Sequence, residues 1–547
     1  MKLLLLFLLI TTVLSYKYVI FVPYLANSQV QFSVRVSEVL ANGGHDVTLL
    51  FINHLSDYKT DVKIPKGIKS EFFQLSSLFK TISISAYQLD AFVDGITKKS
   101  MEKDQAATIF KDAGLRDIPG VIAMFSRMGN MFQEGCRLAL RNKEFLKWLE
   151  DEKFDVAYAH VMSTCPLGLI HHAKIPSWAW LNSGPLMEFI AHAVGVPIIP
   201  SYVPPVMMES HDEMGFVART KSLIGHGLMG FMYKRISADA ETEIFRQELN
   251  DPTFPHTMDI GSKCPLIIVN TNEIYDLPRP TLAKVVNIGG LGVGFDSAKP
   301  LTGDFKTISE TGKGLIVFSF GSVAAAHEMP LEWKNSLLAA FASFPDYQFV
   351  MRYVMDDLND RLPKNVHLFK WLPQKDLLLH NKTKAFITHG GYNSMQEAIS
   401  AGLPLVTIAL FGDQPKNAKV ARKHGFAVNI QKSTLSKETI IEALEEVIGN
   451  ESYKQKVSRL SAMVRAQPMK PAERLLRWSE FLAEFKQLDN LVPAGQKLNF
   501  LQYNSLDVLL FLSSVIFIVL YFSYRALRAV FRCCFFRKPV EKKKKNE

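Results

Sequence analysis

AFITHGGYNSMQEAISAGLP, residues 385–404, contains the junction that decides the fold of the chain. Residues 385–388 have the pattern of a buried strand, and His389-Gly390-Gly391 follow. A helical pattern comes next, opened by Asn393-Ser394, with the helix expected over 394–401. Free backbone N–H groups and the positive end of the helix dipole favour an anion at such a junction. Glycine has no Cβ, so the backbone can approach a phosphate closely. The stretch therefore predicts a phosphate or diphosphate site at the start of a helix.

Ser394 and Glu397 leave a second interpretation of this helix start open. Ser-Met-Gln-Glu is also the pattern of a capping box, in which two side chains satisfy backbone N–H groups without a ligand. The spacing alone does not distinguish the two interpretations. His389, Asn393 and Ser394 add N–H, amide and hydroxyl donors at this point, and an anion needs such donors.

Strand and helix patterns alternate on both sides of this junction. Apolar strands separated by helices are typical of a parallel sheet covered on both faces. We therefore predict an α/β fold with two Rossmann-like, doubly wound domains, 16–285 and 307–470, which face a cleft and are joined by a Gly-rich linker at 286–306. The expected strands are 18–23, 47–52, 154–159 and 265–269 in the first domain, and 315–320, 348–353, 385–388, 405–408 and 427–430 in the second.

The N-terminus has the composition of a secretory signal peptide. Residues 3–14 are apolar, and Val13 and Ser15 are the small residues of a cleavage site, which predicts a signal peptide over 1–15. After the second domain, residues 471–504 are expected to form a helix that returns across the first domain, followed by a membrane-proximal segment.

An uncharged run of 17 residues, Val508–Tyr524, predicts a transmembrane helix over 505–524. As a helix this run spans about 26 Å, close to the core of an endoplasmic reticulum bilayer. Basic residues follow, so the tail 525–547 is expected in the cytosol and the body in the lumen. Lys544 and Lys545 resemble a dilysine retrieval signal, although a basic tail that contacts lipid explains them too. We expect a single-pass type I protein of the endoplasmic reticulum membrane.

The net charge of +10 does not indicate nucleic acid binding. The tail 525–547 has nine Lys/Arg and two Asp/Glu, which accounts for +7, so the body is nearly neutral. No nucleic acid partner is expected.

Three cysteines lie in the predicted lumenal body, Cys136, Cys165 and Cys264, so at least one is free or pairs between chains. These three cysteines are scattered along the sequence, so their spacing does not predict a metal site. Asn381 and Asn450 begin glycosylation sequons in a compartment where these could be used.

Residues 371–418, WLPQKDLLLHNKTKAFITHGGYNSMQEAISAGLPLVTIALFGDQPKNA, closely resemble the donor-binding signature of the UDP-glycosyltransferase family. Residues 318–323, FSFGSV, and the run 270–292 resemble the same family. With the two membrane-targeting ends, the likeness covers essentially the whole chain. It is greatest to UDP-glucuronosyltransferase-like, membrane-bound animal members of a nematode-like type, and it implies a GT-B-like arrangement of the two domains.

The resemblance implies a role for each matching residue of the donor site. Trp371 would stack on uracil, and Gln374 would line the nucleoside pocket. Glu397 would accept hydrogen bonds from the ribose hydroxyls, and Ser322 would face the phosphates or the sugar. The diphosphate would be bound by His389, Gly391, Asn393 and Ser394.

Asp413 and Gln414 would hydrogen-bond the hydroxyls of the transferred sugar, since hydroxyls need both acceptors and donors. The implied reaction is sugar transfer with inversion, with UDP-sugar as co-substrate and no other cofactor. No metal is required if the helix dipole and His389 stabilise the diphosphate. Whether the sugar is glucose or glucuronic acid stays open, as does a homo- or hetero-oligomer.

The first domain is implied to bind a small lipophilic acceptor. Residues 185–208, apolar and rich in proline, are a candidate wall of that site, and core packing explains them equally well. In the family pattern a histidine follows the first strand and deprotonates the acceptor, and a carboxylate at the end of a later strand orients it. Here Gln29 stands at the first position and His160 at the second.

Glutamine cannot take a proton near neutral pH, whereas histidine can. One hypothesis is a swapped pair, in which His160 is the general base and Gln29 positions it or the acceptor hydroxyl. The alternative is a catalytically impaired lumenal protein that binds UDP-sugar, a lipophile or a partner without turnover.

Overall fold

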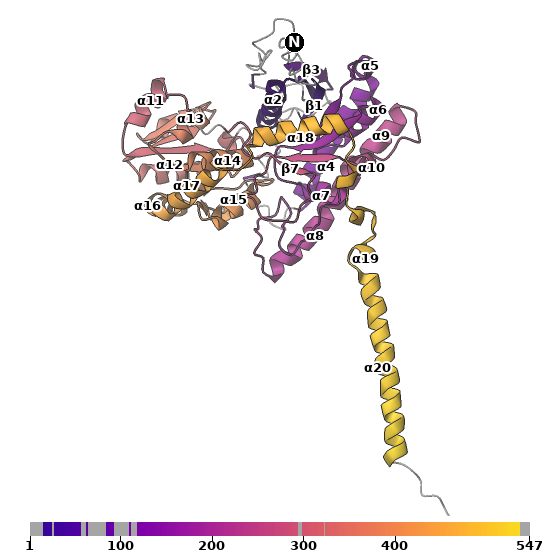
Figure 1. Cartoon of the computed structure of the whole chain (residues 1–547). Helices are drawn as coiled ribbons and strands as arrows, with labels where there is room; N and C mark the ends of the chain where they lie inside the picture. Colours follow the sequence, from indigo (N-terminus) through magenta and orange to yellow (C-terminus); the bar gives the residue numbers. More distant parts are fainter. Residues whose placement is uncertain are drawn as a thin grey trace, which may run out of the picture. The chain divides into compact units, whose positions relative to one another are not determined.

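The computed structural model describes residues 15–23, 27–55, 62–63, 84–91, 109–110, 118–293, 298–321 and 323–535. Several sequence predictions lie outside these residues: the signal peptide apart from Ser15, Ser322, and the end of the tail with Lys544 and Lys545. The described chain forms two units, residues 1–491 and 492–547. The first unit contains both predicted α/β domains (Figure 1).

The first domain, here the N-domain, is built on a seven-stranded sheet in the order β3-β2-β1-β4-β5-β6-β7. Every pairing in it is parallel. Its strands are β1 (Lys17–Pro23), β2 (Asp46–Asn53), β3 (Ile84–Asp90), β4 (Val156–His160), β5 (Ser177–Asn182), β6 (Leu266–Val269) and β7 (Val285–Asn287).

The second domain, here the C-domain, has a six-stranded parallel sheet in the order β10-β9-β8-β11-β12-β13. Its strands are β8 (Gly314–Ser319), β9 (Tyr347–Arg352), β10 (Val366–Phe369), β11 (Thr383–Thr388), β12 (Leu405–Thr407) and β13 (Ala427–Asn429). Two doubly wound parallel sheets confirm the predicted fold class.

Each sheet has a hydrophobic core on both faces, because successive strand residues point to opposite sides. In β1, Val19 and Phe21 join one core, while Tyr18 and Ile20 join the other. The N-domain helices are α2 (Asn27–Asn42), α4 (Ile118–Arg141), α5 (Lys143–Asp151), α6 (Cys165–His172), α7 (Glu188–Ala193), α8 (Phe216–Tyr233), the π-helix η3 (Lys234–Asp239), α9 (Ala240–Glu248) and α10 (Thr257–Ser262).

The helices of the C-domain cover its sheet in the same way. They are α11 (Gly303–Glu310), α12 (Leu331–Ala342), α13 (Gln374–Leu379), α14 (Tyr392–Ala401), α15 (Gln414–Lys423), α16 (Lys437–Gly449) and α17 (Glu451–Arg465). The next helix, α18 (Pro471–Phe485), packs on the N-domain: Leu475 and Leu482 lie in its core, and the Tyr158 hydroxyl donates to Ser479 Oγ at 2.5 Å.

The predicted linker is more ordered at its two ends than its glycines suggest. β7 pairs with β6 and extends the N-domain sheet to Asn287, and α11 begins at Gly303. A strand as short as Val-Val-Asn carries too little periodicity to be separated from a Gly-rich stretch by sequence alone.

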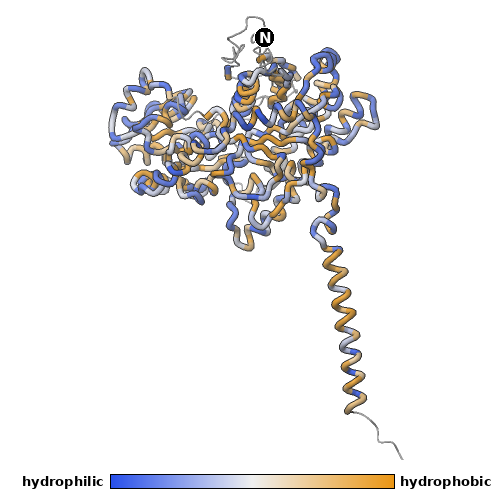
Figure 2. The backbone as a smooth tube through the Cα atoms, in the orientation of Figure 1, coloured by the Kyte–Doolittle hydropathy of each residue, from blue (hydrophilic) through white to orange (hydrophobic). Residues whose placement is uncertain are grey.

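The second unit contains α19 (Phe500–Tyr503) and α20 (Leu506–Phe535). Within the described residues, α20 is the one helix long and apolar enough to cross a membrane. Figure 2 shows its nearly unbroken apolar run. The helix continues beyond the predicted span 505–524 through Arg525, Arg528 and Arg532.

Candidate functional site

The junction between β11 and α14 leaves a helix N-terminus without a side-chain cap. Gly390 has φ +81°, Gly391 is the N-cap residue, and no side chain accepts a hydrogen bond from the first turn. The helix begins at Tyr392, two residues before the predicted start at Ser394. The capping-box interpretation of Ser394 and Glu397 is therefore wrong, and the N–H groups of this turn remain available to an anion.

His389 lies between two glycine loops that leave room only for its ring. A Cβ built on Gly391 would lie 2.7 Å from His389 Nε2, and one built on Gly321 would lie 2.8 Å from Cε1. Burial lowers the pKa of His389 to about 4, and the charge of Arg352 acts in the same direction. At neutral pH the imidazole therefore carries no charge and has a single N–H group, and the ring is already engaged by a hydrogen bond with the Ser319 backbone.

Arg352 is a functional candidate that the motif did not indicate. It is the last residue of β9, it donates a hydrogen bond to the carbonyl of Gly321, and its guanidinium lies 5.6 Å from the centre of the Trp371 ring. The signal in the sequence was an arginine ending an apolar strand, since parallel strands end at the same edge of the sheet. Arg352 brings a cation to the site with His389.

The residues predicted to bind the nucleoside lie together. Trp371 is 62% exposed, so its ring face is available for stacking. Gln374 begins α13 and donates from Nε2 to Glu397 Oε2 at 2.6 Å. Burial raises the pKa of Glu397, while Gln374, Arg35 and Lys375 act against that rise. Arg35 belongs to α2, so the N-domain also contributes charge here.

The two predicted sugar-binding residues differ in how much of their side chain is already engaged. Gln414 Oε1 accepts hydrogen bonds from the backbone N–H groups of Leu410 and Phe411, at 2.9 and 3.0 Å. Gln414 is thus left with its NH₂ group as the part that can bind a sugar. Asp413 accepts from Asn417 at 2.8 Å, and burial raises the pKa of Asp413.

Hydrogen bonds connect the strand ends of the N-domain to helix α14. Asn270, directly after β6, donates from Nδ2 to the Ser183 carbonyl and to Asn393 Oδ1, both at 2.9 Å. Gln396 Nε2 donates to the Asn270 carbonyl at 3.0 Å. His160 Nε2 lies 3.4 Å from Ser183 Oγ. His160 is therefore separated from Asn393 only by Ser183 and Asn270.

His160 also lines a small, largely apolar cavity at the carboxyl ends of β1, β2 and β4. The cavity has a volume of about 40 Å³ and is lined by Phe21, Val22, Pro23, Ile52, His54, Phe132, Cys136, His160, Met162, Ser163, Cys165 and Pro166. His160 Nδ1 has no hydrogen-bond partner, and burial lowers the pKa of His160 to about 3. The ring is neutral near pH 7, with a nitrogen able to accept a proton.

Gln29 lies near the same cavity but is not bonded to His160. Its Nε2 is 3.1 Å from Met162 Sδ, and its Oε1 has no hydrogen-bond partner. Of the two predicted catalytic residues, His160 thus lines the cavity, whereas Gln29 contacts its wall only through Met162.

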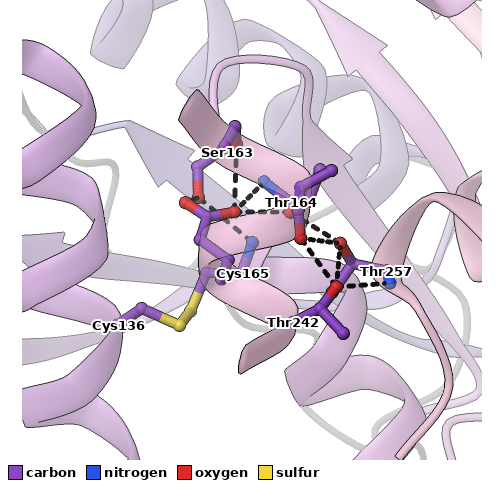
Figure 3. Close-up of a disulfide and its surroundings, with 9 residues drawn as sticks. Cys136, Ser163, Thr164, Cys165, Thr242 and Thr257 are labelled. Atoms are coloured by element: carbon purple, nitrogen blue, oxygen red, sulfur yellow. Dashed lines mark hydrogen bonds between the residues drawn. A yellow bond between two sulfur atoms is a disulfide. The ribbon is translucent and has the colours of Figure 1, made fainter. Parts of the chain in front are cut away.

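The loop after His160 is fixed from two sides. A disulfide joins Cys136 in α4 to Cys165 at the start of α6 (Figure 3). Glu241 in α9 accepts hydrogen bonds from Ser163 Oγ and the Thr164 N–H group, both at 2.7 Å. Burial raises the pKa of Glu241, against the effect of these bonds. This double attachment holds the cavity wall in one conformation.

His54 is a second histidine of the cavity wall that the sequence reading missed. A Cβ built on Gly135 would lie 2.0 Å from His54 Nδ1, so the ring edge packs against α4. Burial lowers the pKa of His54 to about 4. This packing makes His54 a wall residue, whereas the Nε2 of His160 faces Ser183.

The structure also describes the third predicted lumenal cysteine and the asparagines of the two glycosylation sequons. Cys264 is buried and unpaired, which completes the assignment of the three predicted lumenal cysteines. Asn381 and Asn450 are both exposed. Asn450 also caps α17 by accepting from the Ser452 N–H group at 3.1 Å.

Comparisons with known proteins identify the family of the chain. The family described as UDP-glucoronosyl and UDP-glucosyl transferase matches residues 32–546. UDP-glucuronosyltransferase 2B7 of Homo sapiens is 33% identical, over 81% of this chain and 85% of its own length. UDP-glucuronosyltransferase 2B17 of Mus musculus is 32% identical, over 94% of this chain and 92% of its own length.

Two solved structures share the fold. The glycotransferase of kitacinnamycin has a TM-score of 0.55 and 16% identity, over 86% of this chain and 98% of its own. The calicheamicin glycosyltransferase CalG4 has a TM-score of 0.50 and 16% identity, over 86% of this chain and 99% of its own.

Proposed function

The chain belongs to the UDP-glucuronosyl and UDP-glucosyl transferase family and is a UDP-glycosyltransferase; on that premise we propose that it is an inverting, metal-independent enzyme. In this proposal it conjugates glucuronic acid or glucose to the hydroxyl of a small lipophilic acceptor. The observation that carries the proposal is the uncapped N-terminus of α14, whose Asn393 accepts a hydrogen bond from Asn270. Asn270 also donates to the carbonyl of Ser183, whose Oγ lies 3.4 Å from His160 Nε2.

The C-domain supplies what a departing UDP requires. Negative charge grows on the diphosphate as the bond to the sugar breaks, and oriented donors stabilise it most effectively in a site that excludes water. The first turn of α14 and the guanidinium of Arg352 provide such donors, beside the neutral ring of His389. These groups support transfer without a metal ion.

In the N-domain, His160 is proposed as the general base, and Gln29 as the residue that positions the acceptor hydroxyl. The unpartnered nitrogen of His160 and the unpartnered oxygen of Gln29 support this assignment. A pKa of about 3 makes His160 a weak base, so an acidic phenol suits it better than an alcohol.

The test is a comparison of wild type, His160→Ala and Gln29→Ala as full-length protein in microsomes. UDP release and glycoside formation are measured at saturating donor, with both UDP-sugars and a panel of phenols. General-base assistance is worth roughly 10²–10⁴-fold, so His160→Ala should lose about that much turnover. Full activity in His160→Ala would reject the assignment.

A binding protein without turnover is the second candidate. It is favoured by the contact between Gln29 and Met162, because Gln29 then does not orient the proposed base. In the same assay, UDP binding in wild type without glycoside formation from either donor would support this candidate.

We further propose that the protein is a type I membrane protein of the endoplasmic reticulum with its body in the lumen. The apolar α20 and the basic residues that follow it support this orientation. Changing Lys544 and Lys545 to Ser should release the protein to later compartments, visible as complex glycans on Asn381 or Asn450. An unchanged location would exclude retrieval as the function of the tail, and a wild type without any glycan would contradict the lumenal orientation.

A further inference from the structure

Helix α8 exposes a stripe of large apolar side chains to the surface. Six large apolar side chains are each between 52% and 77% exposed: Phe216, Val217, Leu223, Ile224, Leu228 and Phe231. At 100° per residue they occupy a single stripe of the helix. Ser222, on the opposite side, is fully buried.

The inner face of α8 contacts the N-domain. His226 Nε2 lies 2.8 Å from the Val203 carbonyl oxygen, and a Cβ on Gly225 would lie 3.0 Å from Pro205. By contrast, α16 on the surface of the C-domain buries Ile440, Leu444 and Val447 in the usual way. The exposed apolar stripe of α8 is therefore a local property and does not describe the surface helices in general.

The charged residues inside the segment 214–238 are all basic, whereas Asp212 and Glu213, just before it, pair with Lys423 of the C-domain. Residues 214–238 contain Arg219, Lys221, Lys234 and Arg235 and no Asp or Glu. Lys234 and Arg235 also pair with Asp239, just beyond the segment. An apolar helix face with basic flanks matches a membrane surface, with acyl chains for the stripe and phosphate headgroups for the cations.

The chain itself keeps this helix near a bilayer if α20 is inserted. The segment between Leu491 and Leu506 can span at most about 50 Å when fully extended. This tether keeps the body at a high effective concentration beside the membrane, so even a modest affinity is sufficient for contact.

We propose that α8 lies in the interface of the same membrane that α20 spans, with Phe216, Ile224, Leu228 and Phe231 among the acyl chains. The inference rests on the proposed anchoring by α20. It also places the acceptor cavity near the lipid, because the hydroxyl of Tyr233, the last residue of α8, donates to the Val161 carbonyl at 3.0 Å. Val161 directly follows His160.

The test uses the full-length chain in nanodiscs of phosphatidylcholine and phosphatidylserine. A trace phospholipid carries a diazirine at the end of its acyl chain, and labelled peptides are identified by mass spectrometry after illumination. Peptides from both α20 and α8 should be labelled. The double variant Ile224→Glu, Leu228→Glu should lose α8 labelling by roughly tenfold or more while α20 stays labelled, because a carboxylate opposes insertion.

The matched control is Leu331→Glu, an equally exposed leucine in the C-domain, which should leave α8 labelling unchanged. Thermal unfolding of each variant checks that the fold is retained. Labelled α20 with unlabelled α8 overturns the inference and leaves the anchoring intact. Labelling of neither helix overturns both, and crosslinks between two copies of α8 in place of lipid show that a second chain covers the stripe.

Discussion

The C-domain and the N-domain share one architecture and differ in how they bind. The donor site of the C-domain depends on backbone: two glycine loops, a helix N-terminus, and a histidine that fits between them. The cavity of the N-domain, proposed here as the acceptor site, depends on side chains such as His160 at the end of β4. His160 and the nearby Gln29 of α2 each have an unpartnered polar atom. A backbone site tolerates few changes, whereas a side-chain site can exchange residues while the fold is kept.

The largest effect expected is on the N-domain. Replacing both Cys136 and Cys165 with Ser releases the loop after His160 and removes a constraint on the unfolded chain, which typically costs about 2–5 kcal/mol. We expect a clear fall in the unfolding temperature by calorimetry. UDP affinity of the remaining folded protein should be unchanged, because Cys136 and Cys165 lie in α4 and α6, which contribute no residue to the candidate donor site. An equal loss of UDP affinity at temperatures where the variant is folded would contradict the separation of the two halves.

The candidate donor site of the C-domain can be tested by adding one methyl group at Gly391. In Gly391→Ala the added Cβ meets His389 Nε2 at 2.7 Å, and the backbone at φ −58° accepts alanine. His389 must therefore move out of the site, and we expect UDP affinity to fall roughly 10–100-fold, or about 1.4–2.8 kcal/mol. Isothermal titration calorimetry measures the change. Gly449→Ala, where the Cβ meets nothing, is the matched control. Wild-type affinity in Gly391→Ala would remove His389 from the donor site.

The smallest effect expected is on the pH dependence of turnover. A base with an ordinary histidine pKa of about 6.5 would lose roughly fourfold in activity between pH 7.5 and pH 6, because it becomes protonated. Burial lowers the pKa of His160 to about 3, so the reactive neutral form persists throughout this range. We expect kcat/KM for a phenol to be nearly constant between these values. A fourfold fall that is absent in His160→Ala would show that the pKa is not lowered.

The donor site could be predicted from sequence because its geometry is local. His389, Gly391 and Asn393 follow a strand directly, and the glycines determine the backbone path. Arg352 was missed because its contact with the Gly321 loop joins β9 to β8, and such a pairing becomes visible only when the sheet order is known. The start of α14 at Tyr392 was also not predictable, since the capping box and the open N-terminus have the same spacing.

The acceptor half was predicted less completely, because its contacts join distant residues. Ser183 follows β5, a strand whose Trp-rich sequence SWAWLN was not recognised, and Asn270 follows β6. The loop of His160 depends on Glu241, which lies 77 residues beyond Thr164 in the sequence. Local propensity carries no information about such a partner. The exposure of the apolar stripe of α8 has the same origin, since the sequence shows a stripe but not which side of the helix faces the protein.

The hydrogen bonds of Asn270 limit how freely the two halves of this molecule can be exchanged between relatives. Asn270 Nδ2 reaches Ser183 and Asn393 together, and Gln396 returns a bond to the Asn270 carbonyl. A chimera that takes its acceptor half from another protein keeps the donor in register only if the incoming strand end also presents an amide to Asn393 and Gln396. Exchange of one half of this architecture for another therefore depends on the hydrogen bonds among the side-chain amides of Asn270, Asn393 and Gln396. It depends on them as much as on the residues that touch either substrate.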